Sequence, residues 1–107
     1  MYQNANIKFK EVYIGRLWVV PPYKTNKFYR PHVDNEDPHW VCLYYINDTD
    51  GDTLFFENNQ INSNIIKRVS PKKGRVVLFD GSLWHCPETP TKRTRAVINY
   101  NVTIDNS

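Results

Sequence analysis

Three side chains in this 107-residue sequence have the types and the spacing that a metal site requires. His32 and Asp34 form an H-x-D pair, and His85 stands between an apolar run and a proline-rich turn. On a β-strand, residues i and i+2 project to the same face with Cβ atoms roughly 6–7 Å apart. An imidazole and a carboxylate at such positions can converge on one ion, and His85 could complete the set.

The ligand types alone leave the metal open. Two histidines and one carboxylate make the facial triad of non-haem iron(II) sites, which leaves three coordination positions free. The same three ligands with one free position describe a catalytic zinc site equally well. The third histidine, His39, lies in the turn-like segment 37–39, so we expect it to be solvated rather than a ligand.

Arg95 favours one kind of ligand beside this site. It follows His85 by ten residues and opens a strand-like run in which Arg95, Val97, Asn99 and Asn101 share one face. A buried arginine needs a countercharge, and a bound dicarboxylate gripped by the guanidinium would supply it. Tyr45, in a run that is apolar on both faces, could add a phenol hydrogen bond to the same carboxylate. Arg93 is the next candidate for the cationic role.

The elements that must position these residues are predicted to be strands. Aromatic residues make up 14% of the chain, and no window has the periodicity of a convincing helix. Short apolar runs alternate instead with clusters of Asn, Asp, Gly and Pro. The runs are 12–20, 27–33, 40–46, 53–56, 65–69, 75–79, 82–85 and 96–104. About eight short strands in one domain, 1–107, predict an all-β jelly roll with little or no helix. Residues 1–16 are expected to form an edge strand or an N-terminal extension.

Charge and composition narrow the class of protein. The net charge of +3 is spread over small clusters, which disfavours a nucleic-acid partner. No apolar run approaches the ~20 residues of a membrane helix, and the first residues lack the pattern of a secretory signal. Two cysteines 44 positions apart, Cys42 and Cys86, make no metal-binding pair, and we expect both to be reduced. The expectation is a soluble, cytoplasmic protein without a membrane partner.

The ordered motifs resemble one known family, the iron(II)- and 2-oxoglutarate-dependent dioxygenases, and within it the prolyl-4-hydroxylase-like group. The resemblance covers about residues 17–103 and rests on five elements in order. Two tyrosines, Tyr23 and Tyr29, precede the H-x-D, and residues 42–47 are similar to a "YYLN" strand. Residues 50–55 resemble a "GGxTxF" element, and residues 69–80 resemble the "PxxGxxxxFxx" strand. The spacing of His85 and Arg95 matches the distal histidine and the basic residue of the family.

The resemblance implies a double-stranded β-helix of the cupin type and a role for each residue. His32, Asp34 and His85 would bind Fe(II), and Arg95 would pair with the distal carboxylate of 2-oxoglutarate. Tyr45 would assist Arg95. Tyr23 would line the cosubstrate pocket. Dioxygen is the second cosubstrate, and ascorbate is allowed as a further cofactor. The implied reaction hydroxylates an unactivated C–H bond and releases succinate and CO2.

The implied substrate is a peptidyl proline or another amino-acid side chain, in a peptide, a protein or a small molecule. Two departures stand out. Asp50 and Gly51 replace the usual Gly-Gly, and only about sixteen residues precede Leu17, where family members usually carry helices that cover the sheet. The chain is then a reduced core, or part of a longer protein, or one whose bare face a partner covers, a second copy included.

Two other functions remain open from the sequence. One is a non-catalytic jelly-roll binding module that retains the metal site. The other is a zinc hydrolase on a cupin-like barrel, which leaves Arg95 unexplained. Metal content combined with a succinate-release assay separates the three.

Overall fold

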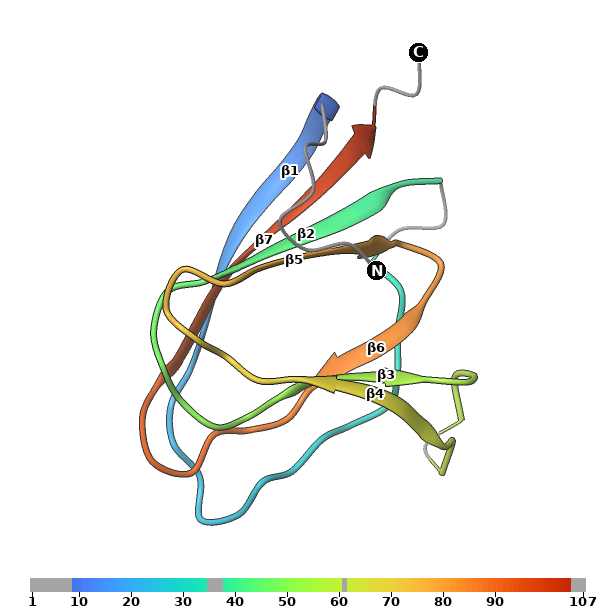
Figure 1. The fold of residues 1–107 in the computed structure, drawn as a ribbon. Helices are drawn as coiled ribbons and strands as arrows, with labels where there is room; N and C mark the ends of the chain where they lie inside the picture. The colour runs from blue at the N-terminus through green and yellow to red at the C-terminus, as the bar shows by residue number, and fades with distance from the viewer. Residues whose placement is uncertain (1–8, 35–37, 61, 105–107) are drawn as a thin grey trace.

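The chain folds into two facing β-sheets (Figure 1). The computed structural model describes residues 9–34, 38–60 and 62–104. These residues form strands and no helix, so the all-β prediction is confirmed. The strands are β1 (Phe9–Val20), β2 (Trp40–Tyr45), β3 (Thr53–Phe56), β4 (Ile65–Val69), β5 (Val76–Asp80), β6 (Trp84–Pro87) and β7 (Arg95–Ile104).

The larger sheet has the order β1-β7-β2-β5, and the smaller has the order β4-β3-β6. All the pairings are antiparallel. Consecutive strands repeatedly switch between the sheets, as expected for a jelly roll. β6 and β7 therefore do not form a hairpin, and the chain between them crosses from one sheet to the other. Arg95, the first residue of β7, consequently lies in the sheet opposite to the one that carries His85.

The core fills the space between the sheets. Tyr45 and Phe79 from the larger sheet and Phe55 from the smaller one belong to one buried cluster, and the rings of Phe55 and Phe79 meet edge to face at 4.8 Å. β7 has the two faces that its sequence predicts. Val97 faces this core, whereas Val102 packs on the outer side of the sheet with Cys42 and Leu78.

One predicted strand is not formed. Residues 27–33 follow the free edge of β6 without regular pairing, and only His32 makes a bridge, to His85. The physical reason is that some residues of the segment lack a free backbone N–H donor for pairing. Pro31 has no N–H to give, and the amide of Lys27 is taken by the side chain of Thr89. The segment thus occupies the place of a fourth strand of the smaller sheet while remaining irregular.

The N-terminal strand is an edge of the larger sheet. The prediction for residues 1–16 falls partly outside the described residues, because 1–8 are not described; residues 9–16 belong to β1. The outward side chains of Leu17 and Val19 are 61% and 57% exposed.

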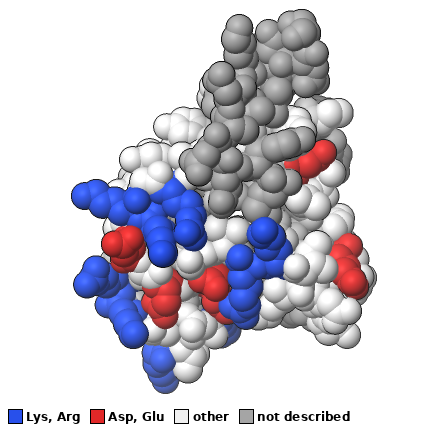
Figure 2. Space-filling model, in the orientation of Figure 1, with Lys and Arg blue, Asp and Glu red and all other residues white. Residues whose placement is uncertain are grey.

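No helix among the described residues is long and apolar enough to cross a membrane. Positive and negative side chains are interleaved on the face shown in Figure 2.

Candidate metal and cosubstrate site

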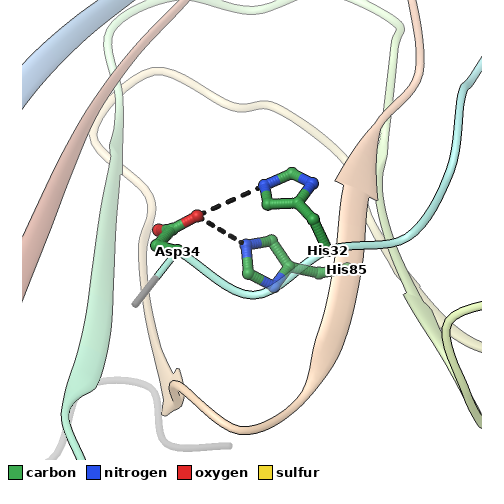
Figure 3. Close-up of side chains that lie close together, drawn as sticks. All are labelled: His32, Asp34 and His85. Carbon is green, nitrogen blue, oxygen red and sulfur yellow. Dashed lines mark ion pairs between the residues drawn. The ribbon is translucent and has the colours of Figure 1, made fainter. Parts of the chain in front are cut away.

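The structure brings His32, Asp34 and His85 together (Figure 3). His85 stands on β6, and the two backbone hydrogen bonds that it exchanges with His32, of 2.9 and 3.0 Å, fix the irregular segment beside it. Asp34 follows two residues later, where the chain bends. Its Oδ1 lies 3.2 Å from Nε2 of His32 and 3.5 Å from Nε2 of His85. The pairing of one segment with β6 therefore assembles all three side chains.

Neighbouring groups orient two of these side chains. Nδ1 of His85 lies 2.9 Å from the carbonyl oxygen of Leu83, which can only accept, so Nδ1 carries the proton and Nε2 points to Asp34. Nδ2 of Asn99 donates to the other carboxylate oxygen of Asp34 at 3.0 Å. Burial alone would raise the pKa of Asp34, but its contacts with His32, His85 and Asn99 outweigh this effect and hold that pKa well below its usual range.

The arrangement fits a metal ion. The three ligand atoms lie within 4.8 Å of one another, and in the described part of the chain this is the one group of three or more such residues that could share an ion. Two ligands about 2.1 Å from an ion and 90° apart would be separated by about 3 Å. The two distances to Asp34 are close to that value, and an ionised carboxylate with two imidazoles is a donor set that iron(II) and zinc both accept.

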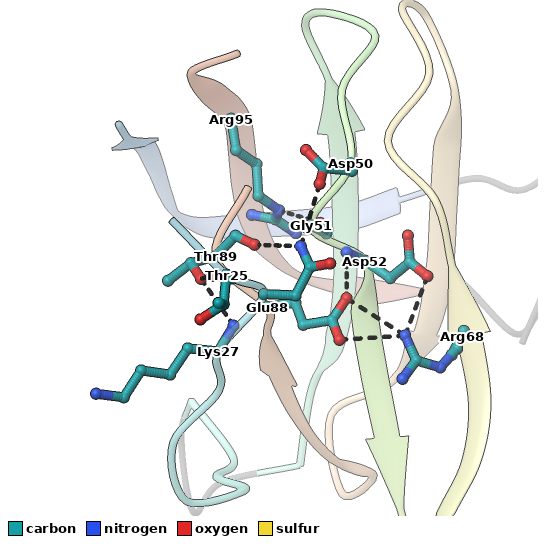
Figure 4. A network of polar contacts seen from close by, with 10 residues as sticks. Thr25, Lys27, Asp50, Gly51, Asp52, Arg68, Glu88, Thr89 and Arg95 are labelled. Carbon is teal, nitrogen blue, oxygen red and sulfur yellow. Dashed lines mark hydrogen bonds and ion pairs between the residues drawn. The ribbon is translucent and has the colours of Figure 1, made fainter. Parts of the chain in front are cut away.

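Arg95 is a buried cation without a carboxylate partner in the described part of the chain. Its side chain is 4% exposed, and its guanidinium donates to the carbonyl oxygen of Gly51 and to Oγ1 of Thr53, each at 2.8 Å. None of the ion pairs between described residues includes it. Asp52 is close enough to act on its charge but pairs with Arg68 at 3.4 Å instead (Figure 4). Burial lowers the pKa of Arg95, yet an arginine keeps its charge at ordinary pH.

A cavity of about 160 Å³ connects the two features. Its lining includes the three clustered side chains, together with Arg95 and Thr53. The walls between them are mostly apolar, with Leu43, Val97 and Val20 among the lining residues. A small molecule with an anionic group for the guanidinium and oxygen atoms for an ion would match this lining.

The structure treats the two predicted tyrosines differently. Tyr45 is fully buried, and its hydroxyl lies 2.7 Å from Oγ1 of Thr53, which itself accepts from Arg95. Burial raises the pKa of this phenol, so it stays protonated. Tyr23 is 46% exposed; its amide donates to Pro90, and it is not among the residues that line the cavity. Tyr45 is not among the lining residues either, and its hydroxyl contacts Thr53. The structure therefore brings Tyr45 next to Arg95 but behind the cavity lining, and it leaves Tyr23 at the surface.

The sequence did not identify Thr53 and Asn99 as residues of the site, and the expected exposure of His39 was wrong. Thr53 links Tyr45 to Arg95, although the sequence marks it only as part of a motif. Asn99 shares a strand face with Arg95 in the sequence pattern, and that was the available signal for its contact with Asp34. His39, expected to be solvated, is 5% exposed and packs against Gly81, whose missing Cβ leaves room for the imidazole.

The departure at Asp50 and Gly51 has a structural role. Gly51 has φ of +90°, and a Cβ there would lie 2.8 Å from the carbonyl oxygen of Glu88, so this position requires glycine. Asp50 accepts hydrogen bonds from the amide of Thr91 at 2.8 Å and from Nδ2 of Asn26 at 3.2 Å. It thereby ties together the loops that contain Asn26 and Thr91, next to the residue whose carbonyl holds Arg95.

Comparisons with known proteins agree with this geometry. The sequence matches the model of the 2OG-Fe(II) oxygenase superfamily over residues 19–103, and no curated protein matches it. Among solved structures, the chain is similar to the crystal structure of a Pseudomonas putida prolyl-4-hydroxylase, with a TM-score of 0.59 and 20% identity. The similarity covers 83% of this chain and 51% of that one, so this chain spans about half the length of that protein. The family match over most of the sequence shows that the chain belongs to the 2OG-Fe(II) oxygenase superfamily.

Proposed function

We propose that the protein is an Fe(II)- and 2-oxoglutarate-dependent dioxygenase that hydroxylates an unactivated C–H bond. The observation that carries this proposal is the cavity with a buried, carboxylate-free Arg95 at one part of its lining and three clustered metal-binding side chains at another. A keto diacid has the two functions that this lining requires: a carboxylate for the guanidinium, and keto and carboxylate oxygens that can chelate an ion.

In this proposal, His32, Asp34 and His85 hold iron(II), and each neighbouring contact has a task. The Leu83 carbonyl fixes the tautomer of His85, and Asn99 keeps the second oxygen of Asp34 occupied so that Oδ1 faces the ion. The bound iron would supply oxygen activation. In the overall reaction, 2-oxoglutarate loses CO2 and becomes succinate with one atom of dioxygen, and the other atom enters the substrate as hydroxyl.

Arg95 and its neighbours set the direction in which the cosubstrate binds. The bonds to Gly51 and Thr53 leave little freedom for the guanidinium, and the walls around the carboxylate that it would hold are mostly apolar. A preorganised arginine of this kind binds a carboxylate more tightly than a mobile one, because less entropy is lost on binding. The hydroxyl of Thr53 and the phenol of Tyr45 extend this polar cluster.

A zinc hydrolase uses the same three ligands but has no need for the buried arginine. A binding module has no need for an ion-binding cluster joined to an anion site by a cavity. These differences favour the oxygenase. Within that activity, we propose an amino-acid side chain as the substrate, a peptidyl proline included, since the motifs and the fold are similar to those of prolyl-4-hydroxylases. Ascorbate as a further cofactor stays a prediction.

The test is succinate formation by the iron-loaded protein with 2-oxoglutarate and dioxygen. We expect succinate from the wild-type chain, and none above background from His85→Ala or after chelation of the metal. Zinc-loaded protein should also form none. A wild-type protein that binds iron at the expected stoichiometry but forms no succinate, with or without a peptide library, would favour the binding module.

A further inference from the structure

β1 is the outer strand of the larger sheet, and one of its long edges has no partner strand among the described residues (Figure 1). The other edge pairs with β7, and the register shifts of that pairing all lie before Ile14. Proteins commonly protect an exposed edge with proline, bulges or charged side chains. Segment 14–20 contains no proline and no bulge, and its charged residue is Arg16. This part of the edge is therefore open to pairing with a further strand.

The pairing inside the sheet determines which backbone groups this edge presents. The amide of Ile46 donates to the carbonyl oxygen of Ala96 at 3.0 Å, so even-numbered residues of β7 direct their N–H and C=O groups to β2. Odd-numbered residues of β7 face β1 instead, and there Val97 lies opposite Trp18. Because these directions alternate along a strand, the residues of β1 that alternate with Trp18 point away from β7. The residues whose backbone groups face the free edge, without a partner among the described residues, are Gly15, Leu17 and Val19.

The side chains of β1 on the inner face of the sheet line the proposed site. Trp18 lines the first cavity and also a second one, of about 330 Å³, whose lining includes Arg16. Both linings include His32 and Asp34 of the ion-binding cluster. Trp18 is 51% exposed, so the wall that it forms lies at the surface. A strand added about 4.8 Å away at the free edge would place every second side chain on this face, beside the two cavities.

We infer that the substrate is an extended polypeptide segment that pairs antiparallel with the free edge of β1, an inference that rests on the proposed function. Main-chain hydrogen bonds to Gly15, Leu17 and Val19 hold the segment, and every second side chain lies beside the cavities, where one of them is hydroxylated. An extended chain satisfies a row of backbone donors and acceptors, whereas a free amino acid or another small molecule satisfies only part of it. The position of the edge beside the ion-binding cluster favours the substrate over a second copy of the chain.

The pairing also determines which residues of the segment need an N–H group. A residue whose side chain lies beside the cavities stands opposite Arg16 or Trp18, and its own N–H and C=O groups point away from β1. The residues before and after it donate to β1. The hydroxylated position can therefore be proline, which has no N–H, since proline fits an edge strand where its nitrogen faces solvent. Its two neighbours cannot be proline.

Peptide turnover and binding test this inference. End-blocked nine-residue peptides of randomised sequence are incubated with the iron-loaded protein, 2-oxoglutarate and dioxygen, and a mass gain of one oxygen identifies a substrate and its hydroxylated residue. That peptide is then N-methylated at single positions, and its affinity for the anaerobic protein with Fe(II) and 2-oxoglutarate is measured by calorimetry. N-methylation of either neighbour of the hydroxylated residue should weaken binding about tenfold, because a hydrogen bond is lost. N-methylation of the hydroxylated residue itself, where it is not proline, should leave the affinity nearly unchanged.

Leu17→Pro removes the amide at the centre of the free edge and should weaken binding of the peptide about tenfold, whereas Leu17→Ala keeps the amide and should weaken it less. Thermal unfolding shows whether each variant is folded, and the N-methyl series needs no variant. The inference is overturned if no peptide gains oxygen while succinate forms, if N-methylation of the neighbours has no effect, or if folded Leu17→Pro binds the peptide like wild type. A dimer that Leu17→Pro dissociates, measured by sedimentation, would assign the edge to a second copy instead. Binding of 2-oxoglutarate, measured by the same calorimetry, reports separately on the proposed function.

Discussion

Replacement of Arg95 by methionine removes the guanidinium while keeping a long side chain of similar shape. We expect this variant to lose affinity for 2-oxoglutarate. Arg95 as a whole residue is 4% exposed, so its charge is largely removed from water. Truncating one partner of such a buried charged pair typically costs about 2–5 kcal/mol, which corresponds to roughly 30-fold to 4,000-fold in the dissociation constant.

The stability of the variant separates binding from a structural role. Arg95→Met loses the hydrogen bonds to Gly51 and Thr53, but it also removes a buried charge that has no carboxylate partner among the described residues. Replacing buried charges by apolar groups is often neutral or stabilising. We therefore expect the unfolding free energy without ligand to change much less than the affinity does.

The assay is a thermal unfolding series with increasing 2-oxoglutarate on the metal-loaded protein without oxygen. Wild type should gain stability by RT ln(1 + [L]/Kd), and Arg95→Met should gain almost none. Arg93→Met, two positions earlier and exposed, is the matched control and should behave like wild type. Equal stabilisation of Arg95→Met and wild type by 2-oxoglutarate would refute the assignment of Arg95, and loss in Arg93→Met alone would move the role to that residue.

Three further predictions concern the surroundings of the site. Asn99→Leu should weaken binding of Fe(II) about tenfold to a hundredfold, since Asp34 loses a hydrogen bond; an unchanged metal titration would contradict this. Asp50→Ala should lower the unfolding free energy by about 1–2 kcal/mol in urea at pH 7. Hydrogen bonds, above all from Thr91, depress the pKa of Asp50, so wild type should lose this advantage as the pH falls below about 4; a difference independent of pH would count against it. Burial raises the pKa of Cys86 to about 11, so about one thiol in a thousand is ionised at pH 8. Iodoacetamide should therefore label Cys86 only as the protein unfolds, and rapid labelling of the native protein would be the contrary result.

The strands that could be predicted are those that the sequence delimits on both sides. β3 and β4 begin and end at the predicted residues, because apolar runs are bounded there by Asn, Asp and Gly or by Ser and Pro. Residues 27–33 have a similar composition but form no strand. Composition reports which side chains suit a pleated surface, whereas pairing depends on backbone donors, and Pro31 supplies none.

The candidate site was predictable to the extent that it depends on local spacing. The approach of His32 to Asp34 follows from two positions along one extended segment, and the face shared by Arg95 and Asn99 follows from the strand period. The link from Arg95 to Thr53 joins two different sheets, so it depends on how the sheets pack. Spacing was also insufficient for Tyr23, because its distance along the sequence from the H-x-D does not determine which way its ring points.

A crystal structure of the protein with Mn(II) in place of iron and with 2-oxoglutarate, prepared without oxygen, would show whether the three side chains and Arg95 form one site. We expect one anomalous peak about 2.0–2.2 Å from the ligand atoms of His32, Asp34 and His85. We also expect the distal carboxylate of 2-oxoglutarate to contact the guanidinium of Arg95. A metal bound elsewhere would rule out the three ligands, and a cosubstrate whose carboxylates both lie away from Arg95 would rule out the role of Arg95.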